Sequence, residues 1–128
     1  MFLRPLRLGM VALALTSAAA ALGHAAPATD LRVAVLGDLA PFRAIAADTL
    51  GFAAKGDVVA AQKRGTDLET AWDEAEDKLK ATDPARWRVV DKAIDRVLAE
   101  LRAAKPRQSG ITAALQDLLA TMDKGGAT

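Results

Sequence analysis

Apolar residues recur at steps of three and four through the middle of the chain, which is the spacing of one face of an α-helix. This stripe begins at Val58 and ends at Leu79, and charged residues fill most of the positions between its members. Its members are Val58, Ala61, Gly65, Leu68, Trp72, Ala75 and Leu79. The pattern predicts one long amphipathic helix from about Asp57 to Ala81, with its other faces in water.

Residues that favour helix ends flank this segment on both sides. Gly56 can end an earlier helix, and the carboxylate of Asp57 can cap the first turn of the long helix. At the far end, Asp83 is a capping residue and Pro84 is a first-turn proline for the next helix. We therefore expect a tight turn at residues 82–84.

Three more segments carry the helical period. Asp38 is the expected cap of the first, and the second, which starts after Pro84, should stop before Pro106 because proline cannot continue a helix. Ser109 is the expected N-cap of a short last helix that ends before Gly125. The apolar positions are Phe42, Ile45, Thr49 and Phe52, then Trp87, Val90, Ile94, Val97, Leu101 and Ala104, and finally Ile111, Leu115, Leu118 and Met122.

Leu31, Val33 and Val35 alternate with other residues instead, which fits either a strand or a helical extension kinked near Pro41. A lone strand would have no partner strand in this chain, so we favour a helix. Short connections between successive amphipathic helices make neighbouring helices antiparallel. The sequence thus predicts an all-α domain, an up-and-down antiparallel helical bundle of about four helices.

The N-terminus has the plan of a cleaved secretory signal peptide. Two arginines are followed by residues 8–22 without a charge, and Gly23 and Ala25 are the small residues that signal peptidase requires. An uncleaved anchor would need about 20 predominantly apolar residues, and this segment is shorter. We expect a signal peptide at 1–25, a helical bundle domain at 26–128, and export to the periplasm.

Cleavage would remove His24, the single histidine, from a chain that also lacks cysteine and tyrosine. Nucleophilic catalysis needs a base such as histidine, and haem would need an axial ligand or a Cys-x-x-Cys-His motif. Loss of Arg4 and Arg7 takes the formal net charge from +1 to about −1, which gives no attraction for nucleic acid or anionic lipid. We expect no catalytic residues, no cofactor and no enzymatic activity.

Trp72 and Trp87 are the most conspicuous candidate binding residues. If their helices pair about the turn at 82–84, the two indoles lie at comparable levels of the bundle. Both occupy apolar stripes, so we expect them to pack in the core, with Trp87 buried. The alternative is a shallow ligand or partner pocket walled by indole, because tryptophan often keeps its N–H end in water.

Acidic residues gather on the same two helices, and carboxylate oxygens are ligands for calcium and magnesium. They are Glu69, Asp73, Glu76 and Asp77 on the long helix, and Asp91 and Asp95 on the next. Basic residues at i,i+4 spacing are interleaved with acidic ones, in the pairs Glu74–Lys78, Glu76–Lys80 and Arg96–Glu100. The sequence has no calcium-binding loop, so we expect a solvated, charge-balanced face and no metal site.

Residues 68–101 carry a Trp-Asp pair at Trp72, an Asp-Pro-x-x-Trp turn that ends at Trp87, and an Asp-x-x-x-Asp spacing at Asp91 and Asp95. In these features the segment resembles small uncharacterised exported helical proteins of Gram-negative bacteria. The resemblance implies a periplasmic compartment and a helical fold, and no activity follows from it.

These observations favour a periplasmic, cofactor-free helical module that binds another protein. The possible partner or ligand surface comprises Trp72, Trp87, Asp73, Asp91 and Asp95. One alternative is a carboxylate-based divalent cation binder, and another is a structural or stress-related bundle. We expect the partner to be a periplasmic protein, and not nucleic acid or membrane.

The exported protein should begin at Ala26, because Gly23 and Ala25 satisfy the small-residue requirement for cleavage. The intact mass of protein recovered from the periplasm measures this directly. A mature form that retains His24 would show that the cut lies elsewhere.

Overall fold

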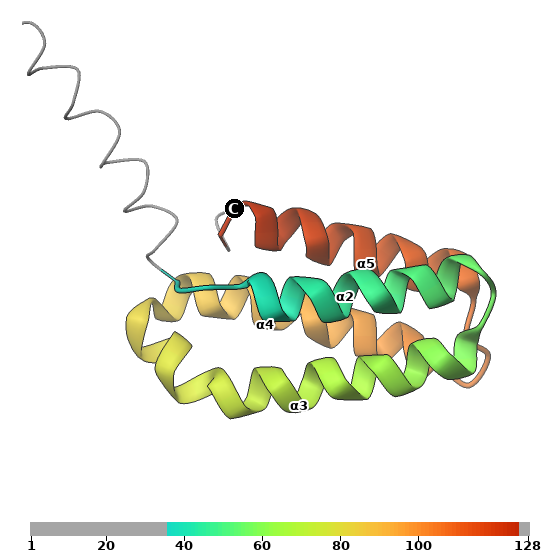
Figure 1. Ribbon diagram of the computed structural model, residues 1–128, viewed down its shortest axis with the longest axis horizontal. Coiled ribbons are helices and arrows are strands. Elements are labelled where there is room, and N and C mark those ends of the chain that lie inside the picture. The colour runs from blue at the N-terminus through green and yellow to red at the C-terminus, as the bar shows by residue number, and fades with distance from the viewer. Residues whose placement is uncertain (1–35, 126–128) are drawn as a thin grey trace, which may run out of the picture. The chain divides into compact units, whose positions relative to one another are not determined.

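The computed structural model describes residues 36–125, which form four α-helices and contain no strand (Figure 1). The helices are α2 (Ala40–Ala54), α3 (Val58–Thr82), α4 (Pro84–Leu101) and α5 (Gln108–Asp123). None of the helices in this part of the chain is long and apolar enough to cross a membrane. The alternating segment at Leu31, Val33 and Val35 lies outside the described residues.

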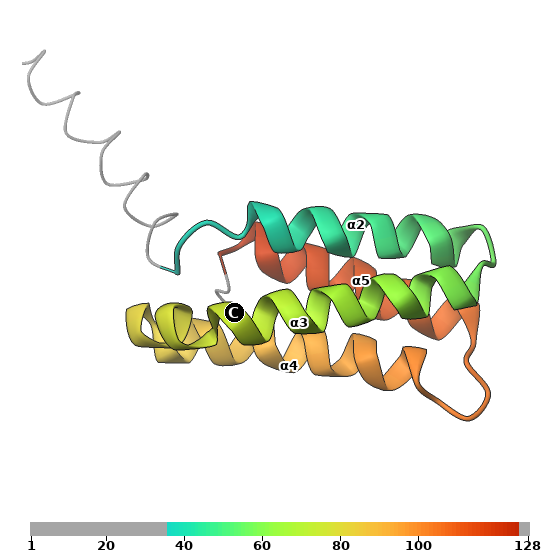
Figure 2. The same cartoon turned by 60° about the horizontal axis from the view of Figure 1, so that its bottom comes forward.

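Successive helices run in opposite directions, and each packs against the next (Figures 1 and 2). The ring of neighbours closes because α5 also packs against α2. Residues 36–125 therefore form an up-and-down antiparallel four-helix bundle, which confirms the all-α prediction.

The turns around α3 use the expected capping groups. Asp57 Oδ1 accepts a hydrogen bond from Ala60 N at 3.0 Å, and Asp83 Oδ1 accepts one from Arg86 N at 3.1 Å. Gly56, at the end of the α2–α3 connection, has a φ of 80°, a conformation that glycine adopts without strain. Each carboxylate satisfies an N–H group that has no partner within its helix.

Three predicted helix ends differ from the structure. The N-cap of α2 is Leu39 and not Asp38, whose carboxylate accepts a hydrogen bond from Ala40 N at 2.9 Å. Helix α4 stops at Leu101, so Ala104 lies outside it and is exposed. Helix α5 begins at Gln108, and the expected cap, Ser109, is therefore already inside its first turn.

The carboxylate of Glu100 in α4 lies against the first turn of α5. It is so close to Gly110 that an alanine Cβ at this position would collide with it. A carboxylate near a helix N-terminus is favourable, and here it comes from another helix.

The core is one continuous apolar cluster to which all four helices contribute. Its largest fully buried members are Trp72, Leu68, Ile94, Leu101, Ile111, Leu115 and Leu118, together with Leu36 from the segment before α2. The one buried polar side chain among the described residues, Thr49, donates its hydroxyl to Ile45 O at 2.8 Å. The predicted stripes of apolar residues therefore do face the core.

Helix α3, at about 37 Å, is much longer than α2, at about 22 Å. The α3–α4 turn consequently projects beyond the ends of α2 and α5 (Figure 1). A short N-terminal strap, Leu36–Leu39, runs over this projection and buries both of its leucines. A Cβ at Gly37 would lie 3.4 Å from Leu79 Cδ2, so the strap contacts the apolar side of the hairpin.

Salt bridges connect each pair of neighbouring helices. They are Arg64–Asp48 between α3 and α2, Arg102–Glu69 joining the end of α4 to α3, Arg96–Asp117 between α4 and α5, and Arg43–Asp123 between α2 and α5. Three expected pairs within single helices are not among the salt bridges of the described residues: Glu74–Lys78, Glu76–Lys80 and Arg96–Glu100. Arg96 contacts Asp117 of α5 instead. Each exposed pair contributes about 0–1 kcal/mol, so their main effect is to fix which surface charges are neutralised.

Gly65 lies where α3 packs closely against α4, since an added Cβ would be 2.5 Å from Leu101 Cδ1. We expect Gly65→Ala to lower the free energy of unfolding by about 1–3 kcal/mol, the usual cost of overpacking a core. The matched control Gly51→Ala adds a Cβ that meets nothing within 4 Å. It should raise the free energy by about 0.5–1 kcal/mol, because alanine favours helix over glycine. Urea unfolding measures both, and stabilisation by both variants would contradict this packing.

Candidate functional site

The two tryptophans stack against each other inside the bundle. Their ring centroids are 6.3 Å apart and their planes differ by 8°. Phe42 from α2 meets Trp72 edge-on at 5.2 Å, and Lys80 Nζ lies 4.8 Å from the centroid of Trp87. The structure thus places both indoles at one level of the bundle, as predicted from the hairpin.

Burial determines what these indoles can do. Trp72 is 2 % exposed and Trp87 is 7 % exposed, so the expected burial of Trp87 is confirmed. Trp72 Nε1 donates a hydrogen bond to Asp91 Oδ1 at 3.0 Å, while the buried Trp87 Nε1 has no partner among the described residues. Both indoles therefore belong to the hydrophobic core.

The carboxylates of α3 and α4 come close enough to influence one another. Partial desolvation raises the pKa of Asp95, and the negative charges of Asp91, Asp73 and Glu69 raise it further. Glu69 is itself paired with Arg102 at 2.7 Å, and that hydrogen bond lowers its pKa. No group of three acidic, histidine or cysteine side chains that could hold a metal ion is found in residues 36–125. The cluster therefore concentrates negative charge beside Asp95.

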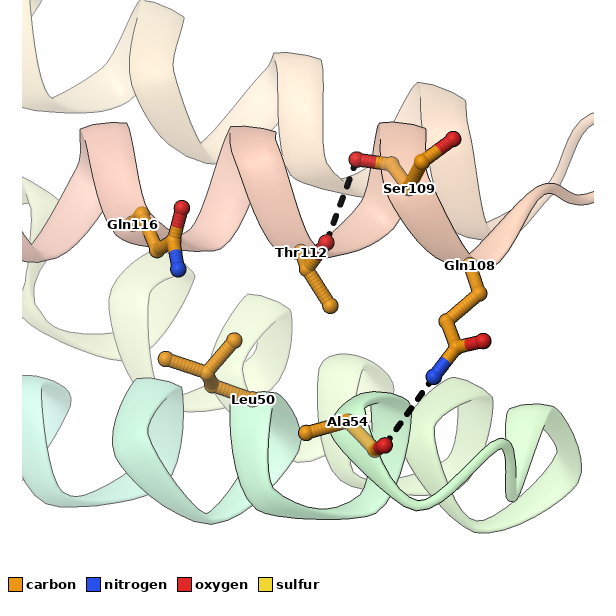
Figure 3. Close-up of a pocket in the computed structure, with 6 residues that line it drawn as sticks. All are labelled: Leu50, Ala54, Gln108, Ser109, Thr112 and Gln116. Atoms are coloured by element: carbon orange, nitrogen blue, oxygen red, sulfur yellow. Dashed lines mark hydrogen bonds between the residues drawn. The ribbon is translucent and has the colours of Figure 1, made fainter.

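An open groove lies between α2 and α5 (Figure 3). It has a volume of about 480 Å³ and is lined by Leu50, Ala54, Gln108, Ser109, Thr112 and Gln116. Gln108 Nε2 closes one end by donating to Ala54 O at 3.0 Å, and Thr112 Oγ1 donates to Ser109 O at 3.1 Å. Aliphatic carbons, hydroxyls and amides line the groove, and none of these side chains is ionisable.

The outward surface of α2 extends this neutral region. Helix α2 has only three polar residues, Arg43, Asp48 and Thr49. Its exposed positions include the small residues Ala40, Ala44, Ala47, Gly51 and Ala54. Arg43 and Asp48 are both engaged in salt bridges with neighbouring helices. We call this region, the groove and the small residues of α2 together, the α2–α5 face.

Sequence reasoning did not identify the α2–α5 face. The predicted surface residues Asp73 and Asp95 are exposed on the α3–α4 side, Asp91 is half-buried, and the tryptophans are inside. The available signal was the composition of residues 40–54, which contain only three polar residues and therefore leave small apolar residues outside the predicted core stripe.

No protein-family model matches the chain, and neither a curated protein nor a solved structure is significantly similar to it.

We expect Asp95→Asn to raise stability at neutral pH. The raised pKa of Asp95 in the folded state means that the folded protein binds the carboxyl proton more tightly than the unfolded chain does. The protonated carboxyl therefore contributes to the free energy of unfolding below the ordinary pKa of about 3.9, and this contribution is lost as pH rises through the folded-state pKa. Asparagine cannot ionise and avoids the repulsion at pH 7. The gain should be a fraction of a kcal/mol, because an exposed carboxylate is screened by solvent.

Thermal melts of wild type and Asp95→Asn at several pH values measure this effect. The melting temperatures should differ at pH 7 and converge at acidic pH. Asp77→Asn, which alters an exposed carboxylate that forms no salt bridge in the described structure, is the control and should change little. A lower melting temperature for Asp95→Asn at pH 7 would show that the charge stabilises the fold.

Proposed function

We propose that this chain is an exported, cofactor-free helical module that binds another protein chain through the α2–α5 face. The observation that carries the proposal is an uncharged groove beside a helix whose solvent side consists mostly of alanine and glycine, with Arg43 and Asp48 as its two charged residues. A helix with so few polar residues on its outer side is usually covered by other protein. Export is inferred from the leader pattern in residues 1–25.

The chemistry of the groove favours a polypeptide over a small charged ligand. Leu50 and Thr112 offer methyl groups between the two helices, and the amide of Gln116 lies beside them (Figure 3). Such a surface can accept an aliphatic side chain and hydrogen-bond a neighbouring backbone group. None of the six side chains that line the groove is charged, so none of them would pair with a phosphate, a carboxylate or a metal ion.

A divalent cation binder is the weaker proposal. Asp91 already accepts the indole N–H of Trp72, and Glu69 is held by Arg102. A cation at these helices would have to compete with both interactions for oxygen ligands. Calcium normally takes six to eight oxygens, some of them from a flexible loop.

Photo-crosslinking in cells that export the protein tests binding at the α2–α5 face. A photoreactive amino acid at Ala47 should form a discrete adduct with another polypeptide, because Ala47 is exposed on this face. The same amino acid at Ala99, an exposed position of α4, is the control and should form no adduct of that size. Adducts at neither position, or equal adducts at both, would contradict binding through this face.

A further inference from the structure

We propose that the polypeptide bound at the α2–α5 face presents an acidic segment, whose carboxylates pair with Lys55 and Arg107 while a neighbouring aliphatic side chain enters the groove. This inference rests on the proposed function, because it names the chemistry of the partner at the same site. It is carried by two exposed cations at one end of a groove whose lining is uncharged.

Lys55 and Arg107 border the same end of the groove. Lys55 directly follows Ala54, and Arg107 directly precedes Gln108. Ala54 and Gln108 both line the groove, and the hydrogen bond from Gln108 Nε2 to Ala54 O, at 3.0 Å, joins the two segments (Figure 3). The end of α2 and the start of α5 therefore place two exposed cations beside one groove.

Salt bridges neutralise the charges within α2 and α5 but leave these two cations unpaired. Neither Lys55 nor Arg107 forms a salt bridge in the part of the chain that the structure describes. In contrast, every charged residue within the two helices is in a salt bridge: Arg43, Asp48, Asp117 and Asp123. The end of the groove is thus where this face offers positive charge that is not already neutralised.

The acidic residues at this end of the bundle are already engaged. Asp57 caps the first turn of α3, the Glu100 carboxylate lies against the first turn of α5, and Glu69 pairs with Arg102. Lys105, on the connection between α4 and α5, is a further exposed cation without a salt bridge among residues 36–125. An approaching carboxylate therefore meets a surplus of positive charge.

The lining of the groove selects a polypeptide among anionic ligands. Leu50 and the methyl group of Thr112 can contact an aliphatic side chain, and the amide of Gln116 can bond to a peptide group. An acyl chain could use the first kind of contact but not the second. Charge pairs at the edge of an interface govern partner choice and association rate more than affinity, so we expect modest, salt-sensitive binding.

Fluorescence anisotropy of labelled peptides, measured with the mature protein, tests the acidic segment. The probe is a short peptide of alternating leucine and glutamate, and a second probe carries glutamine in place of each glutamate. Wild type should bind the acidic peptide saturably and at least about tenfold more tightly than the neutral one, because only carboxylates form charge-assisted hydrogen bonds with the two cations. Raising the salt concentration from about 50 mM to about 500 mM should weaken this binding, since exposed charges are screened.

Charge reversal locates the binding on the protein. Lys55→Glu/Arg107→Glu should weaken binding of the acidic peptide at least about tenfold, because attraction becomes repulsion at the end of the groove. The matched control Lys78→Glu/Arg88→Glu should bind as wild type does. It reverses one exposed lysine on α3 and one exposed arginine on α4, neither of which forms a salt bridge with the described residues. Circular dichroism establishes that both double variants are folded.

Several results would overturn the inference. Equal affinity of wild type for the acidic and the glutamine peptides would show that charge plays no part in recognition. Equal losses in the two double variants would show attraction to net charge alone. Failure to bind the acidic peptide at about 1 mM, the weak end of measurable affinities, would also overturn it. So would binding to vesicles of anionic phosphatidylglycerol in place of the peptide, because the partner would then be a lipid surface.

Photo-crosslinking at Ala47 separates failure of this inference from failure of the proposed function. An adduct that is lost in the Lys55→Glu/Arg107→Glu background and kept in the control background supports an acidic partner. An adduct that persists in both backgrounds leaves protein binding at this face intact and overturns the acidic partner. Absence of an adduct in wild type, together with no binding of the acidic peptide, removes both.

Discussion

The packing of Trp72 against Trp87 is the contact around which this bundle is organised. It joins α3 to α4 next to their shared turn, and the edge of Phe42 brings α2 to the same point. Aromatic pairs of this kind bury large areas and add specific geometry to the hydrophobic effect. The hydrogen bond from Trp72 Nε1 to Asp91 adds a polar link between α3 and α4 and satisfies a buried N–H group that would otherwise cost free energy.

Fixing α4 in this way has electrostatic consequences. It brings Asp91 and Asp95 toward the acidic residues of α3, where the pKa of Asp95 is raised. Salt bridges between neighbouring helices take up the charges that border α2, and α2 itself contributes few. A local acidic cluster therefore lies on the α3–α4 side, whereas the side chains that line the α2–α5 groove are uncharged. This division, more than any single side chain, is the basis for proposing a protein partner at the α2–α5 face.

The sequence determined the helices and their order by itself. Capping by Asp57 and Asp83 is local chemistry, since each carboxylate bonds to an amide three residues away. The period of apolar residues identified the core, and a turn of known position placed Trp72 beside Trp87. These features depend on contacts within a helix or across one tight turn, and such contacts follow directly from residue spacing.

Only the tertiary structure decided which charges pair and where an uncharged groove forms. Arg96 is one helical turn from Glu100 in sequence, yet it contacts Asp117 of α5, because the packing of neighbouring helices sets where long side chains meet. The first turn of α5 lies against Glu100 from α4, a partner that spacing within α5 cannot reveal. The groove arises in the same way, from residues more than fifty positions apart in the chain. Spacing describes one helix at a time, whereas a surface between helices depends on how they are rotated against each other.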